Sequence, residues 1–220
     1  MVSRWPSLLA AATLLSGCAA SGTRPDDMSA EAHRKAAAEE QQVAAEHARK
    51  YDPSATATKV SGPVAGGRAG GHLDYPDRTR TYNPTAGHRS DAQKHREHAA
   101  QHQAAGKELE RFEEAECQGF DPATRAVCPL LGQVASLEDV SGGVRLRLAE
   151  GVPAEAALAH IRCHLAFART RAFSGMDDCP LYLKGLQAAP STDGSAIDLT
   201  SDESATVELL RNRSRAHVGP

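Results

Sequence analysis

The sequence predicts an α+β protein: a small four-stranded antiparallel sheet with helices on one face, preceded by a long helical or disordered N-terminal arm. The first observation is the uneven distribution of apolar residues. Residues 19–107 contain almost no Leu, Ile or Phe, whereas residues 108–220 contain most of the large aliphatic side chains. The second observation is an internal repeat within the apolar part. We therefore expect one compact domain at residues 117–220.

The repeat relates two segments at a constant offset of 51 residues. The Cys-Pro-Leu run at 128–130 corresponds to the same run at 179–181, and Gly143 corresponds to Gly194. Each copy has the pattern of two strands followed by a helix. The repeat therefore predicts a duplicated β-β-α unit.

In the first copy, strands are predicted at 134–140 and 144–148. The Gly142-Gly143 pair between them favours a tight turn, and the second strand alternates apolar and charged residues. Pro153 is suited to the start of the helix that follows, which we expect to end near residue 172.

In the second copy, strands are predicted at 181–188 and 196–200, on either side of a loop that contains Gly194. Ser201 or Asp202 is a suitable N-cap for a final helix. The two copies together supply the four strands and two of the helices of the predicted domain.

The arm is expected to contain two helices joined by a linker. Residues 28–50 are rich in Ala, Glu, Gln and Lys, which favour helix. Residues 54–87 contain Gly, Pro, Ser and Thr without periodicity, which is typical of a linker. Ser90 can cap a second, His-rich helix over 90–116. We expect the arm from residue 18 to 89 to act as a spacer ahead of this helix and the domain.

The N-terminus has the features of an export signal. Arg4 is followed by an apolar run from Leu8 to Leu15, which is too short to span a bilayer, and then by two small residues. The run Leu-Ser-Gly-Cys at 15–18 resembles the lipobox of bacterial lipoproteins. This resemblance covers residues 1–18 only.

The lipobox resemblance implies that residues 1–17 are removed as a signal peptide and that Cys18 carries the lipid. The residue after the cysteine is Ala19 and not Asp. By resemblance to enterobacterial lipoproteins, this favours sorting to the outer membrane. The expected location is therefore the bacterial cell envelope, on the outer membrane facing the periplasm. The alternative is an ordinary cleaved signal with an unmodified Cys18.

Four cysteines remain in the predicted domain, and an even number in an exported protein favours disulfides. Sequence alone leaves three pairings open. We favour the two that close the shortest loops. The expected bonds are Cys117–Cys128 and Cys163–Cys179.

The second arm helix carries a histidine pattern that is typical of metal binding. His95, His98 and His102 follow an i, i+3, i+7 spacing and so share one helix face. His98 and His102 are four residues apart, which allows two imidazoles to bind one Zn²⁺ or Cu²⁺. His88 could supply a further ligand. The alternative is that these side chains are solvated or pack on the domain.

The helix predicted at 153–172 carries a second cluster, His160, Cys163 and His164. Their i, i+3, i+4 spacing suits a soft metal if Cys163 is a thiolate. The alternative is a disulfide at Cys163 beside a buried, hydrogen-bonded His164. Covalent haem attachment is not expected, because the C-x-x-C-H motif is absent.

Composition and motifs narrow the function. The 25 Lys and Arg against 28 Asp and Glu give a net charge of −3, so no nucleic-acid partner is expected. The motifs of serine hydrolases, zinc peptidases, phosphate loops and EF-hands are absent. We expect a non-catalytic lipoprotein with a disulfide-stapled structural or interaction domain. It would bind the membrane through lipid on Cys18 and contact an envelope protein. The alternative is a Zn- or Cu-binding lipoprotein that uses the His-rich helix.

Overall fold

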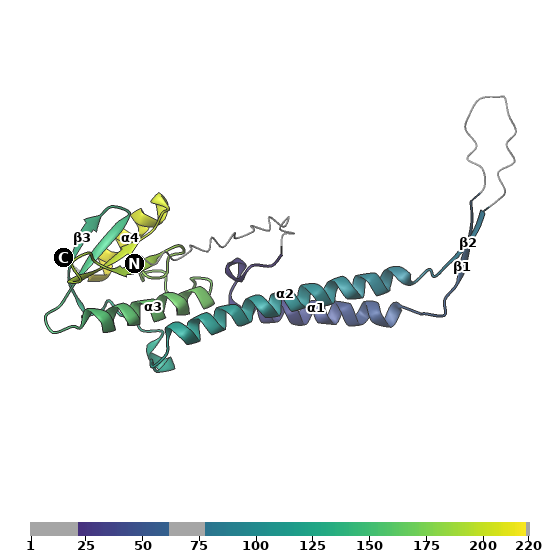
Figure 1. Cartoon of the computed structure of the whole chain (residues 1–220), viewed down its shortest axis with the longest axis horizontal. Helices are drawn as coiled ribbons and strands as arrows, with labels where there is room; N and C mark the ends of the chain where they lie inside the picture. Colours follow the sequence, from purple (N-terminus) through teal and green to yellow (C-terminus); the bar gives the residue numbers. More distant parts are fainter. Residues whose placement is uncertain (1–21, 62–77, 219–220) are drawn as a thin grey trace, which may run out of the picture.

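The computed structural model describes residues 22–61 and 78–218, and it shows a long helical hairpin attached to a smaller α+β domain (Figure 1). The expected signal peptide and Cys18 lie outside the described residues. The expected combination of helices with a four-stranded antiparallel sheet is confirmed. None of the helices in the described part of the chain is long and apolar enough to cross a membrane.

The hairpin consists of α1 (Ala30–Lys50) and α2 (Ala86–Glu116), which lie side by side along most of α1 (Figure 1). Ser29 caps α1, because its hydroxyl accepts a hydrogen bond from the backbone N–H of Ala32. At the far end, β1 (Ala57–Ser61) and β2 (Arg78–Tyr82) pair as an antiparallel ribbon. These two strands occupy both ends of the segment expected to be a linker.

Small residues at heptad spacing allow α1 and α2 to pack closely. Ala30, Ala37 and Ala44 are each 2% exposed on α1, and Ala92 and Ala99 are equally buried on α2. The heptad series on α2 continues at a glycine, Gly106. A Cβ added there would lie 3.3 Å from the Cβ of His33, so the helices are in near contact at this level. The arm therefore has a narrow core built from Ala, Gly and His in place of Leu.

The domain contains one antiparallel sheet in the order β3-β4-β6-β5. The strands are β3 (Val134–Val140), β4 (Gly143–Leu148), β5 (Gln187–Pro190) and β6 (Ala196–Thr200). The central strands pair with Leu146 opposite Ile197. Only β5 begins later than expected, at residue 187. Three consecutive residues from Leu181 to Leu183 are all buried, which a strand with one solvent-exposed face, like those of this sheet, does not allow.

Two helices cover the apolar face of the sheet, namely α3 (Ala154–Thr170) and α4 (Ser204–Val218). A single core cluster contains Leu146 from the sheet, Ile161 from α3 and Leu210 from α4. The opposite face is polar. There, Arg145 on β4 donates two hydrogen bonds to the carboxylate of Asp198 on β6.

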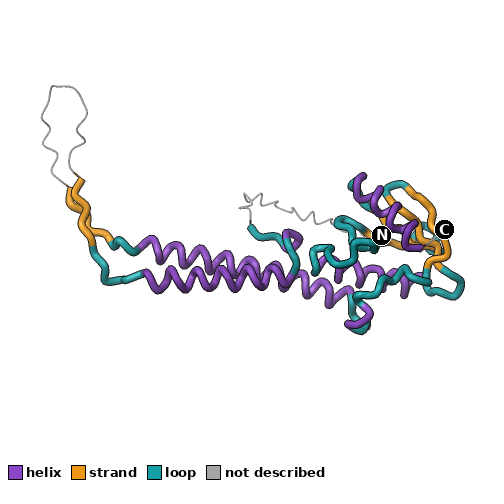
Figure 2. The backbone as a smooth tube through the Cα atoms, turned by 180° about the vertical axis from the view of Figure 1, so that it is seen from behind, coloured by secondary structure: helices purple, strands orange, loops and turns teal. Residues whose placement is uncertain are grey.

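The described chain begins and ends at the domain. Asp26, in the short 3₁₀ turn η1 (Pro25–Asp27), accepts two hydrogen bonds from Arg169 on α3. The chain then runs outward along α1 and returns along α2 (Figure 2). The arm therefore does not separate residue 26 from the domain, and the expected spacer arrangement is wrong. The composition of each helix taken alone did not show that α1 and α2 fold back on each other.

Candidate functional site

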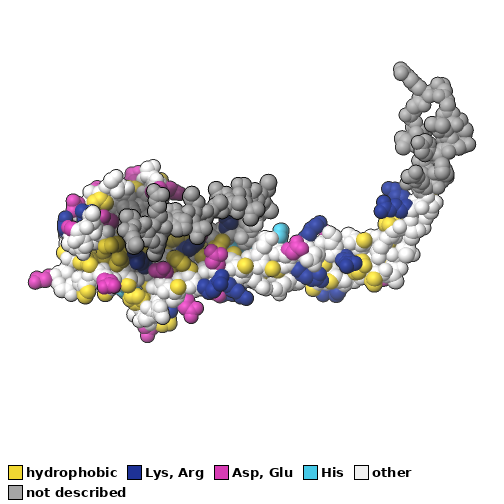
Figure 3. Space-filling view, viewed as in Figure 1, with side chains coloured by type: hydrophobic (Ala, Val, Ile, Leu, Met, Phe, Trp, Pro, Cys, Tyr) yellow, Lys and Arg dark blue, Asp and Glu magenta, His cyan; other side chains and the backbone are white. Residues whose placement is uncertain are grey.

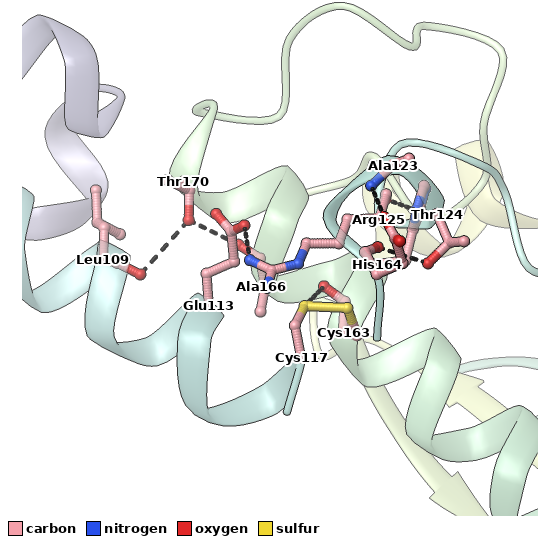
Figure 4. A network of polar contacts seen from close by, with 11 residues as sticks. Leu109, Glu113, Cys117, Ala123, Thr124, Arg125, Cys163, His164, Ala166 and Thr170 are labelled. Carbon is pink, nitrogen blue, oxygen red and sulfur yellow. Dashed lines mark hydrogen bonds and ion pairs between the residues drawn. A yellow bond between two sulfur atoms is a disulfide. The ribbon is translucent and has the colours of Figure 1, made fainter. Parts of the chain in front are cut away.

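A disulfide joins the hairpin to the domain, and its pairing differs from the expected one. Cys117, directly after α2, is bonded to Cys163 in α3 (Figure 4). Both residues are buried, at 1% and 0% exposed. The expected Cys117–Cys128 and Cys163–Cys179 bonds are therefore wrong. Loop length favoured them, but the packing of the end of α2 against α3 decides the pairing.

The other two cysteines lie together without a bond. Cys128 follows the 3₁₀ turn η2 (Pro122–Thr124), Cys179 lies in the loop between α3 and β5, and their Sγ atoms are 3.3 Å apart. The Cys179 thiol donates toward the Cys128 sulfur, and this hydrogen bond lowers the pKa of Cys128. The same bond, together with burial, raises the pKa of Cys179. The shared hydrogen bond therefore favours the thiolate at Cys128 and the thiol at Cys179.

His164 is the third member of this group. Its side chain is fully buried, and its Nδ1 lies 2.9 Å from the backbone carbonyl oxygen of Arg125 (Figure 4). A carbonyl only accepts, so Nδ1 carries the proton and Nε2 presents a lone pair. That Nε2 lies 3.5 Å from the Sγ of Cys179. Burial lowers the pKa of His164 to about 4, which keeps the ring in the neutral form that binds metals.

An ion pair fixes the loop that orients His164. Arg125 donates a hydrogen bond of 2.8 Å to the Glu113 carboxylate on α2, and both side chains are largely buried (Figure 4). The loop whose carbonyl accepts the hydrogen bond from His164 is therefore held by the last turns of the hairpin. Such contacts to the outer nitrogen of a histidine set the orientation and tautomer of the ring.

Two further histidines lie near this group. His160 in α3, a predicted ligand, stacks on Phe120 at a centroid distance of 5.0 Å and does not join the cluster. His217 near the end of α4 lies beside Cys128 and contributes to lowering its pKa. Within the described residues, the Nε2 of His217 is buried and has no hydrogen-bond partner. The Nε2 of His160 is also buried without a partner, but its ring stacks on Phe120, whereas the His217 ring adjoins Cys128.

The predicted trio in the His-rich helix does not converge. His95 contacts the Glu40 carboxylate of α1 at 2.5 Å, and His102 pairs with His33 through Nδ1 atoms 3.1 Å apart. The side chain of His98 is 62% exposed and lies 3.9 Å from Glu40. Residues seven apart are separated by about 10 Å along a helix axis, so His95 and His102 occupy different layers of the hairpin. Each found a partner on α1, which the spacing within a single helix could not reveal.

Three residues of this interface were missed by the sequence analysis. His33 and Glu40 belong to the layers just described, and His47 pairs with His88 through Nδ1 atoms 3.1 Å apart. A signal was available, because His88, His95 and His102 recur every seven residues and the alanines of α1 do the same. Matching heptads in two helices indicate a coiled coil.

The Cys128–Cys179–His164 group is the strongest candidate site. Its three ligand atoms all lie within 4.8 Å of one another, and it is the only such metal-ligand grouping of His, Cys, Asp and Glu among the described residues. The offset of 51 residues pointed to a relation between the two cysteines, but not to their contact.

Compared with known proteins, the chain matches no family model, no curated protein and no solved structure.

Proposed function

We propose that the protein is a non-catalytic lipoprotein of the bacterial periplasm, anchored in the outer membrane through Cys18. In this proposal its disulfide-stapled domain lies next to the membrane, and the hairpin carries an interaction site away from it. The observation that carries the proposal is the docking of Asp26 on Arg169 of the domain. This contact supports a position of the proposed lipid anchor on the domain side of the hairpin.

The lengths of the segments support this arrangement. Cys18 precedes Asp26 by eight residues, which span at most about 28 Å when fully extended. From Gly106, where α1 begins to pack, the hairpin and its ribbon extend for about 45 Å. The far end of the hairpin therefore reaches farther from the docked N-terminus than the lipid does.

The charge at the far end of the hairpin suggests the partner. Lys59 and Arg80 are opposite each other in the β1–β2 register, and both are exposed. Arg49, Lys50 and Arg89 add positive charge on the adjoining helix ends. Figure 3 shows basic side chains on this part of the arm. We propose that the ribbon end binds an acidic surface of an envelope protein.

The proposed duplication of the domain is supported by its strand register. Leu146 and Ile197 are equivalent at the offset of 51 residues, and they lie opposite each other in the β4–β6 pair. The equivalent cysteines, Cys128 and Cys179, also meet. Two copies related by a local twofold axis would produce both contacts. A duplicated, stapled module would serve as a rigid base for the hairpin.

The anchor is tested by changing Cys18→Ser in the full chain expressed in a bacterium. We expect the wild type in the membrane fraction, with a diacylglyceryl group on Cys18 by mass spectrometry, and the variant in the soluble envelope fraction. Equal membrane association of both chains would refute lipid anchoring.

The orientation is tested by coupling the mature chain through Cys18 to vesicles that contain a lipid-borne quencher. A fluorophore at Ser174, which lines a surface pocket together with Ser29 just before α1, should be quenched more than one at Lys59 on the ribbon. Equal quenching at both positions would contradict a hairpin that projects from the membrane-proximal domain.

The partner site is tested by in-cell cross-linking from position Tyr82 on the ribbon, which is 47% exposed. Lys59→Glu with Arg80→Glu should abolish the cross-link. Lys107→Glu with Arg111→Glu makes the same charge change at the domain end of α2 and should leave it intact. Loss in both variants, or in neither, would argue against binding at the ribbon.

A further inference from the structure

We propose that Cys128, Cys179 and His164 form a structural zinc site, with His217 as the fourth ligand. This site does not depend on the lipid anchor or on a partner for the hairpin. It joins four separate parts of the domain: the loop after η2, α3, the loop before β5, and the end of α4.

Two of the distances within the group fit a tetrahedral ion. Zn–S bonds of about 2.3 Å and Zn–N bonds of about 2.0 Å place neighbouring ligand atoms roughly 3.5 to 3.8 Å apart. The His164 Nε2 lies 3.5 Å from the Cys179 Sγ, and the two Sγ atoms are 3.3 Å apart. An ion would need to separate the sulfurs by only about 0.5 Å.

The orientation of His164 also fits a ligand. Its Nδ1–H donates a hydrogen bond to the Arg125 carbonyl oxygen, so the lone pair of Nε2 is directed to the cysteine side. Glu113 holds Arg125 from α2. Zinc-binding histidines characteristically donate their outer N–H to a carbonyl or carboxylate in this way.

His217 provides an independent observation. Its Nε2 is buried, has no hydrogen-bond partner within the described residues, and belongs to a ring beside Cys128. An unpaired buried ring nitrogen is costly, and coordination would satisfy it. His217 lies outside the group whose ligand atoms are within 4.8 Å of one another, so coordination requires its imidazole to move toward the other three ligands.

The ligand types and the burial select the ion. Two thiolates and two imidazoles suit Zn²⁺, whereas Mg²⁺ and Ca²⁺ prefer oxygen. Cys128, Cys179 and His164 are at most 4% exposed, so the site has no open access for substrate. Four protein ligands in a closed site are typical of structural zinc.

A Cys128–Cys179 disulfide is the competing state. Its formation would release two protons and transfer two electrons to an oxidant, whereas zinc binding releases the thiol protons and transfers no electrons. Both states would staple the two halves of the domain. Only the zinc state uses the two imidazoles, and this difference makes the alternatives distinguishable.

The test uses the mature chain with Cys18→Ser, isolated from the bacterial envelope. We expect one zinc per chain by elemental analysis, and two thiols that alkylate only after unfolding with a chelator. Peptide mapping should place them at Cys128 and Cys179. Recovery of a Cys128–Cys179 disulfide peptide, or two free thiols without zinc, would overturn the proposal.

Co²⁺ added to the metal-free chain provides a spectroscopic readout. Tetrahedral coordination should give intense visible bands together with a thiolate-to-metal band in the near ultraviolet. His164→Ala and His217→Ala should each change these bands and weaken Co²⁺ binding. Unchanged spectra in His217→Ala would exclude it as the fourth ligand.

Two variants separate ligation from a general loss of structure. Glu113→Gln should weaken Zn²⁺ binding by about 10- to 100-fold, because it loosens the loop that orients His164. His98→Ala with His102→Ala removes two histidines outside the cluster and should leave one zinc per chain. Loss of zinc in this control would place the metal on the His-rich helix and refute the proposed site.

Discussion

Removal of the Cys117–Cys163 disulfide should destabilise the domain by about 4 kcal/mol. The bond closes a segment with a sequence separation of 46 residues. In the chain-entropy model, a cross-link that closes a loop of this length lowers the conformational entropy of the unfolded chain. This raises the free energy of the unfolded state by about 4 kcal/mol at 25 °C. We therefore expect the double substitution Cys117→Ala, Cys163→Ala to lower the free energy of unfolding by this amount.

The assay is urea denaturation of the metal-free protein, followed by the near-UV circular dichroism of tyrosine. Tyr182 is 4% exposed in the domain core, so its signal reports on the domain in particular. The far-UV signal is dominated by the long helices and should be recorded separately. A lower midpoint with an unchanged slope would show a change of stability alone.

The matched control is Cys128→Ala with Cys179→Ala, which removes two buried sulfurs that are not bonded in the structure. In the metal-free thiol form, this control should lose less stability than the disulfide variant. A loss below about 1 kcal/mol in the disulfide variant would refute the entropic reasoning. It would mean that α2 and α3 remain associated in the unfolded ensemble.

Three further predictions address the core, the hairpin and the docked N-terminus. Leu146→Ala should cost about 2 to 5 kcal/mol in urea denaturation, because this central-strand side chain is fully buried; a cost below 1 kcal/mol would place it outside the core. Gly106→Val should destabilise the hairpin by about 1 to 3 kcal/mol in thermal far-UV melts, since even a Cβ would lie 3.3 Å from His33; an unchanged melt would contradict the close packing. The hydrogen bond from Arg169 lowers the pKa of Asp26 below its ordinary value of 3.8. The docking contribution should therefore be complete above about pH 4 and be lost as the pH falls through the lowered pKa. Limited proteolysis should cut the wild-type N-terminus faster at acid pH, and Asp26→Asn should be cut rapidly even at neutral pH; equal cutting of both chains at neutral pH would contradict the docking.

Elements that depend on local patterning could be predicted from the sequence. The alternation around Val144 and Leu146 indicates a strand with one buried face, and both residues are buried in β4. The exception is informative. Residues 181–183 are apolar and were expected to form a strand, but they fill the core from a loop. An apolar run specifies burial, whereas the strand itself needs backbone pairing.

The candidate site depends on contacts between distant segments, and these could not be derived from spacing. Cys117 bonds to a residue 46 positions away, and Cys128 meets Cys179 across 51 positions. His102 was expected to share an ion with His98, but its partner is His33 on the other helix. The spacing within one helix shows which of its own side chains share a face, but not which side chains of another helix they contact. Comparing the heptads of both arm helices would have indicated the His33–His102 pair.

The last turns of α2 link the hairpin to the Cys/His group. Glu113 and Cys117 are four residues apart and therefore share one face at the end of the helix. Cys117 bonds this face to α3, and Glu113 pairs with Arg125, whose carbonyl orients His164. A displacement of α2 would thus act on the disulfide and on the proposed zinc ligand together. If force or partner binding at the ribbon tilts the hairpin, the zinc affinity should change with it. Glu113→Gln should weaken this coupling while leaving the disulfide in place.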